Sequence, residues 1–234
     1  MLITLAAPAF AGTWYIENGD ITVKASGTEG KNKVSQGNNP EVEDTNTIIT
    51  NQKTDTASSH TVTIDAGNDK VEVTLKDVNI DTSSRNKAAV SVTGSGNTTI
   101  KLDGDNALKS DIYRSGIYGS GSGSLTISGG ENDSLTAQGR SGANGISSSG
   151  SLTISGGTVT ANGDDGGRGI SSSGSLTISG GTVTATGGNS TDSVGSGGSG
   201  IYSVSGDVTI SGGRTVTANG GSGTISGGSG SYSG

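Results

Sequence analysis

Sixteen consecutive residues, GISSSGSLTISGGTVT, occur twice in the chain, starting at Gly145 and at Gly169, an offset of 24 residues. Looser copies start at Gly116 and Gly200. Repeats of about 20–50 residues indicate a solenoid, a propeller or an array, because each unit buries its apolar side chains only by stacking on its neighbours. This repeat constrains the fold more than any other feature of the sequence.

Inside each repeat, apolar residues alternate with Ser and Thr between glycines, which is the pattern of short β-strands. The alternation predicts that Leu152, Ile154, Val159 and Ala161 face inward. Gly-Gly pairs such as 156/157 and 180/181 mark tight corners. Five equivalent aliphatic positions lie 27, 29, 24 and 31 residues apart: Val90, Ile117, Ile146, Ile170 and Ile201. We therefore predict an all-β parallel β-helix with 24–31 residues and three short strands per coil.

Earlier strands are placed on the repeat by their apolar alternation. Val73 and Leu75 are matched with Leu152 and Ile154, and the next pair, Val78 and Ile80, with Val159 and Ala161. On this alignment, regular coils are predicted from about Val71, well before the near-identical repeats that begin at Gly145.

Composition agrees with a solenoid and limits the partners. Only 28% of residues are hydrophobic, which in a globular chain would indicate disorder, but a coil that stacks on its neighbours needs few core residues. The net charge of −7 argues against a nucleic-acid partner, because phosphates require a basic surface. No segment approaches the roughly 18 apolar residues of a membrane span.

Four regions are predicted along the chain. Residues 1–11 resemble the end of a signal peptide, with an apolar run and the A-x-A-like motif Ala9-Phe10-Ala11, so we expect a secreted or cell-surface protein. Residues 12–60 are predicted as a cap with the first irregular coils, loop-rich between Lys24 and Asn46. Residues 61–220 are the β-helix repeats. Residues 221–234 read as a Gly/Ser-rich decaying or truncated last coil, with one partial strand at 224–226, and an open end predicts end-to-end self-association.

Three phrases carry a resemblance to a known family: VEVTLKDVNID, AAVSVTGSGNTTIKLDGDNALKS and the repeated GSLTISGGTVTATGG. Between Val71 and Gly188 the chain resembles secreted and cell-surface carbohydrate-binding β-helix proteins of anaerobic Gram-positive bacteria. The resemblance implies a right-handed parallel β-helix related to pectate lyases, polysaccharide binding that is usually not accompanied by catalysis, and calcium in some members.

A cation site is predicted where acidic turn residues recur. Asp77, Asp103 and Asp105 fall at equivalent turns of successive coils, about 4.8 Å apart in a stacked sheet, which suits one shared Ca²⁺. Asp is also a common turn former, so solvated turn residues are the alternative.

Ligand-binding candidates are of two kinds. Sugar sites combine an aromatic face with a few polar groups, which points to Tyr118 and Tyr202 at equivalent outward positions and to Tyr113 and Arg114 nearby. The second kind is a flat Thr lattice like the surface of ice-binding solenoids: Thr158, Thr160, Thr182 and Thr184. Exposed tyrosines and strand-forming threonines on a soluble sheet are the plainer explanation of both.

We therefore expect a non-catalytic extracellular protein that binds a polysaccharide or surface glycan. A structural surface protein or adhesin stalk, an ice-binding protein and a pectate-lyase-like enzyme are the alternatives. No catalytic residues are predicted.

Overall fold

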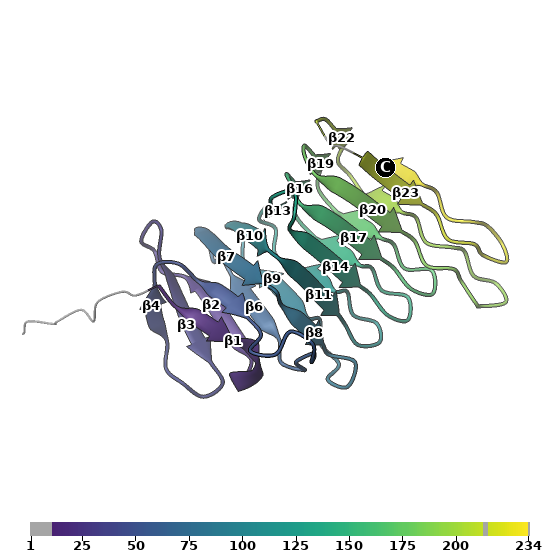
Figure 1. Cartoon of the computed structure of the whole chain (residues 1–234). Coiled ribbons are helices and arrows are strands. Elements are labelled where there is room, and N and C mark those ends of the chain that lie inside the picture. The colour runs from purple at the N-terminus through teal and green to yellow at the C-terminus, as the bar shows by residue number, and fades with distance from the viewer. Residues whose placement is uncertain (1–10, 213–214, 234) are drawn as a thin grey trace, which may run out of the picture.

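The structure is a computed structural model that describes residues 11–212 and 215–233. The predicted signal segment therefore lies almost wholly outside the described residues. Successive coils stack from the N-terminal end to the C-terminal end, and from residue 70 onward each coil contributes one parallel strand to each of three sheets (Figure 1). The chain is a parallel β-helix, as the repeat predicts.

Sheet A is the largest of the three. In spatial order it contains β4 (Val42–Asp44), β3 (Asn32–Gln36), β2 (Ile21–Ala25), β6 (Val62–Asp65), β9 (Val90–Thr93), β12 (Ile117–Gly119), β15 (Ile146–Ser148), β18 (Ile170–Ser172), β21 (Ile201–Ser203) and β24 (Ser231–Ser233).

Sheets B and C complete each coil. Sheet B contains β1 (Thr13–Tyr15), β5 (Ile48–Thr50), β7 (Lys70–Lys76), β10 (Asn97–Asp103), β13 (Leu125–Ser128), β16 (Leu152–Ile154), β19 (Leu176–Ile178) and β22 (Val208–Ile210). Sheet C contains β8 (Asn79–Asp81), β11 (Asp105–Lys109), β14 (Ser134–Gln138), β17 (Thr158–Asn162), β20 (Thr182–Thr186) and β23 (Thr215–Asn219). A short 3₁₀ turn, η1 (Ile16–Asn18), joins β1 to β2.

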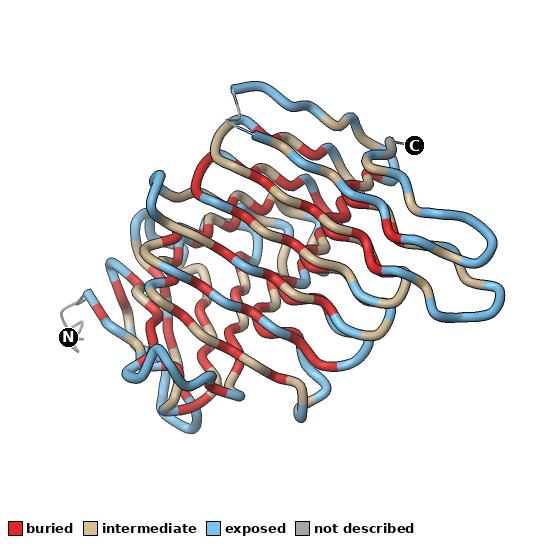
Figure 2. Tube along the Cα trace, turned by 45° about the vertical axis from the view of Figure 1, so that its right-hand side comes forward, coloured by how far each residue is buried: buried red, intermediate tan, exposed pale blue. Residues whose placement is uncertain are grey.

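The core is a set of aliphatic columns that run through the stacked coils. The predicted Val90–Ile117–Ile146–Ile170–Ile201 column is confirmed by the strand register, and its members are completely buried. Leu152, Ile154, Val159 and Ala161 are buried as predicted. Figure 2 shows buried positions alternating mostly with intermediate ones along the strands, while many exposed residues lie in the turns. Burial of each Val, Leu or Ile side chain is worth about 1.5–3 kcal/mol, which lets a chain with few apolar residues form a stable stack.

One prediction about the N-terminal coils is wrong, and another is incomplete. Strand β7 pairs so that Val71 and Val73, not Val73 and Leu75, align with Leu152 and Ile154 through β10 and β13. The strand has three alternating apolar residues, so two registers fit its pattern equally well. The segment from Lys24 to Asn46 contains several turns and loops, as predicted, but it also contains β3 and β4, which extend sheet A as antiparallel strands.

The cap strand β3 is not recognisable from the sequence, because two of its three buried residues are polar. Its buried positions are Asn32, Val34 and Gln36, and the two amides are inside because backbone carbonyls accept their hydrogen bonds. Asn32 Nδ2 donates to the Glu72 carbonyl at 2.8 Å and Gln36 Nε2 donates to the Tyr15 carbonyl at 2.6 Å. The antiparallel hairpin covers the first coil of sheet A, an edge that would otherwise invite association.

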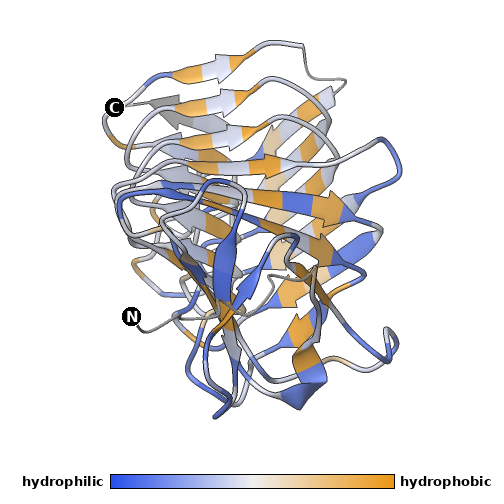
Figure 3. Cartoon of the chain, turned by 90° about the vertical axis from the view of Figure 1, so that its left-hand side faces the viewer, coloured by the Kyte–Doolittle hydropathy of each residue, from blue (hydrophilic) through white to orange (hydrophobic). Residues whose placement is uncertain are grey.

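Later coils are more uniform and less polar. Figure 3 shows hydrophilic segments gathered in the N-terminal part and mostly pale or orange strands towards the C-terminus. Of the last region, β24 pairs with β21, and the predicted strand 224–226 forms only an isolated bridge from Ser226 to Ser196. In the part of the chain that is described, no helix has the length and apolarity needed to cross a membrane.

Candidate functional site

A groove of about 330 Å³ lies on the outer face of sheet A, against the turns that enter it from sheet C. We call it the Tyr118 groove. It is lined by Thr61, Thr63, Asn86, Lys87, Ala88, Ser91, Thr93, Arg114, Tyr118 and Ser120.

The floor of the groove consists of hydroxyl-bearing residues. Val62 and Val90 point into the core, so the alternating positions Thr63 and Ser91 point outward and lie in one column with Tyr118. Tyr118 is 44% exposed and rises above its smaller neighbours. The column therefore changes from small hydroxyls to an aromatic ring within one coil step.

Two stacked turns form the wall. Asn86 belongs to the turn before β9 and Arg114 to the equivalent turn before β12, and Arg114 Nε donates to Asn86 Oδ1 at 3.2 Å. Asp111 joins the turns, because its carboxylate accepts the backbone N–H groups of Ile112 at 2.7 Å and Asn86 at 2.5 Å. These two hydrogen bonds hold the pKa of Asp111 below its usual value, which favours the ionised carboxylate.

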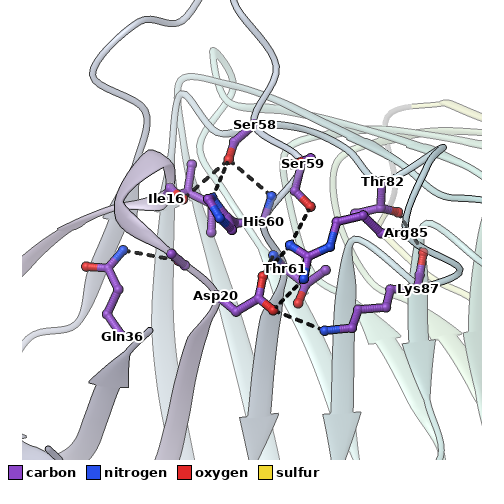
Figure 4. Close-up of polar contacts among 11 residues, drawn as sticks. Ile16, Asp20, Gln36, Ser58, Ser59, His60, Thr61, Thr82, Arg85 and Lys87 are labelled. Atoms are coloured by element: carbon purple, nitrogen blue, oxygen red, sulfur yellow. Dashed lines mark hydrogen bonds and ion pairs between the residues drawn. The ribbon is translucent and has the colours of Figure 1, made fainter. Parts of the chain in front are cut away.

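Lys87 is positioned by a partly exposed cluster of charged side chains around Asp20 (Figure 4). Asp20 accepts from Lys87 Nζ at 3.0 Å, from both terminal nitrogens of Arg85 at 2.9 and 3.0 Å, and from the backbone N–H of Thr61 at 2.9 Å. Asp20 directly precedes β2, so its carboxylate joins the N-terminal cap to the turn that forms the groove wall.

Burial alone would raise the pKa of Asp20, but these contacts outweigh it. The Thr61 N–H, Lys87 and Arg85 together lower the pKa of Asp20 from 3.8 to about 2. The carboxylate is therefore ionised throughout the physiological range and cannot donate a proton. Beside the cluster, His60 contacts Ser58: the serine Oγ lies 3.4 Å from Nδ1 and 3.2 Å from the His60 backbone nitrogen, as Figure 4 shows.

The structure brings some of the predicted ligand residues together and separates others. Arg114 and Tyr118 share the groove. Tyr202 lies in the same outward column beyond Ser147 and Ser171, three coil steps or roughly 14 Å from Tyr118. The Arg168 guanidinium lies 3.7 Å over the Tyr202 ring. Tyr113 is 76% exposed on the turn beside Arg114 but does not line the groove.

The Thr lattice forms on a different face. Thr158 and Thr160 pair directly with Thr182 and Thr184 on sheet C, with Ser134/Thr136 before them and Thr215/Thr217 after them. The predicted register is confirmed, and it presents four rows of hydroxyl side chains.

The predicted cation residues have separate partners. Asp77 Oδ1 accepts the backbone N–H of Asp105 at 3.0 Å, Asp103 pairs with Lys76 at 2.6 Å, and Asp105 accepts from Ser134 Oγ at 2.7 Å. Among the described residues, no group of three or more His, Cys, Asp or Glu side chains is arranged to hold a metal ion. The turns are thus held together by hydrogen bonds and ion pairs, which agrees with the alternative of ordinary turn residues.

Sequence reasoning missed Asn86, Lys87 and the hydroxyl floor. The two turns follow β8 and β11, whose paired residues are 28 positions apart, so counting onward from these strands would have placed Asn86 beside Arg114. Strand alternation would likewise have placed Thr63 and Ser91 in the Tyr118 column. The signal was present in the coil alignment and not in any local motif.

Comparison with known proteins yields no match to a protein-family model, a curated protein or a solved structure.

Proposed function

We propose that this chain is a non-catalytic, extracellular polysaccharide-binding protein whose glycan occupies the Tyr118 groove. One observation carries the proposal: an exposed aromatic ring stands at the end of a hydroxyl-lined floor, with cationic and amide side chains along one wall. The resemblance of the sequence to secreted carbohydrate-binding β-helix proteins supports the same conclusion.

The lining fits the surface chemistry of a sugar. A pyranose ring has an apolar face that packs against an aromatic ring, and its hydroxyls need donors and acceptors at the edge. Tyr118 supplies the ring. Thr63 and Ser91 supply hydroxyls that both donate and accept, while Lys87 and Arg114 donate to sugar oxygens.

An extended glycan also matches the periodicity of the coils. Parallel strands are spaced about 4.8 Å apart, which is close to the advance of one sugar unit in an extended polysaccharide. We propose that the glycan runs parallel to the β-helix axis above the column from Thr63 to Tyr118.

Binding without cleavage is the form of the proposal that the lining favours. Glycoside hydrolysis uses a pair of carboxyl groups that flank the bond. None of the residues that line the groove is acidic, and the nearby Asp20 is occupied by Arg85, Lys87 and Thr61.

The direct test is binding to a glycan array and to insoluble plant and bacterial polysaccharides. We expect retention on at least one of them, and Tyr118→Ala should weaken it by about tenfold or more, equivalent to about 1.4 kcal/mol. Tyr113→Ala is the matched control, since this ring is exposed on the adjacent turn outside the groove. Absence of binding to every glycan, or equal losses in both variants, would reject the proposal.

Secretion is part of the same proposal. The A-x-A-like motif ending at Ala11 should direct cleavage before Gly12. Expression with the native leader, followed by N-terminal sequencing of the exported protein, checks this site. Retention of the uncleaved chain inside the cell would contradict it.

Sheet C supports a second candidate, ice binding. The observation that favours it is the direct pairing of Thr158 with Thr182 and of Thr160 with Thr184. An ice-recrystallisation assay of the wild type and of Thr160→Lys tests it. Equal crystal growth with and without the wild-type protein would eliminate this candidate.

A further inference from the structure

A second pocket lies on the outer face of sheet B, on a different sheet from the Tyr118 groove. Its volume is about 670 Å³. We call it the Tyr15 pocket. It is lined by Thr13, Tyr15, Ile48, Thr50, Asn51, Gln52, Lys76 and Asp103.

The pocket exists because side-chain size changes along one outward column. Tyr15 pairs with Thr50, and Thr50 pairs with Lys76, so a small residue lies between two long ones. Ile48 is the next outward residue on the same short strand and contributes an apolar floor. The neighbouring outward positions of β7 are Lys70, Glu72, Thr74 and Lys76, so this apolar position stands out on the face.

The aromatic wall is held rigidly by the chain around it. On the inner side of the same strand, Trp14 Nε1 donates to the buried Asp44 carboxylate at 2.7 Å, and the Gly12 N–H donates to it at 2.9 Å. Gln36 Nε2 donates to the Tyr15 carbonyl at 2.6 Å. Strand β1 is therefore fixed at three points, and the Tyr15 side chain extends from a backbone that is ordered before any ligand arrives.

The rim is fixed by a second set of contacts. Glu17 Oε1 accepts the backbone N–H groups of Gln52 at 2.8 Å and Lys53 at 3.2 Å. Asn51 uses its amide to bind the backbone of β8, accepting the Asn79 N–H at 2.8 Å. The turn that closes one end of the pocket is thus attached both to η1 and to sheet C.

The opposite end carries a donor and an acceptor side by side. Lys76 Nζ lies 2.6 Å from Asp103 Oδ2, and both side chains are about half exposed. The two oxygens of a gauche vicinal diol are separated by a similar distance. One hydroxyl can therefore donate to Asp103 while its neighbour accepts from Lys76, and the carbon face of the ring packs on Tyr15 and Ile48.

We propose that the Tyr15 pocket is a second saccharide subsite, which binds one sugar ring through a vicinal diol at Lys76 and Asp103 and through stacking on Tyr15. The choice of ligand class rests on the proposed carbohydrate function, but the subsite does not depend on the Tyr118 groove. A chain with two such sites on different sheets would bind neighbouring glycan strands with an avidity above either affinity.

The test is an NMR titration that follows the Ile48 methyl group. The probes are the methyl β-glycosides of glucose, galactose and mannose, with cyclohexanol as a ring of similar size that lacks the diol. Ile49 is the internal control, because it is the next residue and is completely buried. At least one glycoside should shift the Ile48 signal saturably, while the Ile49 signal and the cyclohexanol titration stay flat.

Two variants separate the contacts. Tyr15→Ala should abolish the saturable shift, and Asp103→Asn should weaken it at least about fivefold while leaving the core residues untouched. No shift with any of the three glycosides, an equal shift with cyclohexanol, or shifts that survive in both variants would overturn the proposal. Tyr118→Ala must leave the Ile48 titration unchanged, so failure of this subsite and failure of the groove are distinguished.

Discussion

Asp20→Asn should destabilise the junction between the cap and the first complete coils, and the effect should depend on pH. Asparagine can still accept the Thr61 N–H, but it leaves Arg85 and Lys87 without their anionic partner. The perturbation therefore isolates the charge and preserves the shape of the turn.

The magnitude follows from the shift in pKa. A fall from 3.8 to about 2 corresponds to about 2.4 kcal/mol at about 1.36 kcal/mol per unit. The Asp20 side chain is 34% exposed, so solvent screening reduces this value. We therefore expect Asp20→Asn to lower the free energy of unfolding by about 1 kcal/mol at neutral pH.

The sign of the pH dependence is fixed because the folded pKa lies below the unfolded one. The stabilisation is complete above pH 3.8 and is lost as the pH falls through about 2. The wild type and Asp20→Asn should therefore differ at pH 7 and converge near pH 2. The convergence separates loss of the charge from a general disturbance of the fold.

Urea denaturation at both pH values measures the difference in unfolding free energy. Hydrogen exchange of residues 81–89 reports locally on the same turn, which matters because repeat proteins can unfold in stages. Asp55→Asn, at an exposed turn, is the control and should have no effect beyond about 0.5 kcal/mol. An undiminished difference at pH 2, or none at pH 7, would refute the reasoning.

Two further predictions concern the corners and the end of the stack. Gly181 has a φ of +78°, and a Cβ added there would collide with the Gly157 carbonyl oxygen. Gly181→Ala should therefore lower the free energy of unfolding by about 1–3 kcal/mol, measured by thermal melting. An unchanged stability would show that the corner can relax. Strands β22, β23 and β24 are terminal in their sheets, and Ile210 is 52% exposed on the first of them. Sedimentation velocity should therefore detect self-association at high protein concentration, and Ile210→Lys should reduce it; a monomeric wild type contradicts this expectation.

Sequence was sufficient to predict the architecture because like residues stack on like. A column such as Val90–Ile117–Ile146 is recognisable when the residue types recur at one interval, whatever the length of the intervening turns. The same reasoning failed at β7, where the alternation of Val71, Val73 and Leu75 contains no feature that selects one register. It failed again at β3, whose inward amides are satisfied by distant backbone carbonyls that no local pattern reveals.

Two buried serines are further core positions that a search for recurring aliphatic residues does not find. Ser172 and Ser203 follow an inward isoleucine by two residues and are completely buried. Ser172 Oγ donates to the Gly150 carbonyl at 2.9 Å, and Ser203 Oγ donates to the Gly206 carbonyl at 2.6 Å. A column of serines can therefore be buried in the core, because turn carbonyls of the same or the preceding coil accept their hydrogen bonds.

The two pockets share one physical origin, which explains why the near-identical repeats contain neither. Coils of equal sequence give outward columns of equal height, and such a surface is flat. A depression forms only where large and small residues alternate within a column, as at Tyr15–Thr50–Lys76, or where small residues precede a large one, as at Thr63–Ser91–Tyr118.

This origin predicts that Ser91→Tyr closes the Tyr118 groove. The new ring would fill the outward column one coil before Tyr118 and so remove the depression. Folding should be retained, because tyrosine suits an outward-facing strand position. Polysaccharide retention should fall to the level of Tyr118→Ala. Ser147→Tyr is the matched control, because it adds the same ring one coil on the other side of Tyr118, where no groove residue lies. Full binding by Ser91→Tyr, or equal losses in the two variants, would show that the glycan does not occupy the depression between Thr63 and Tyr118.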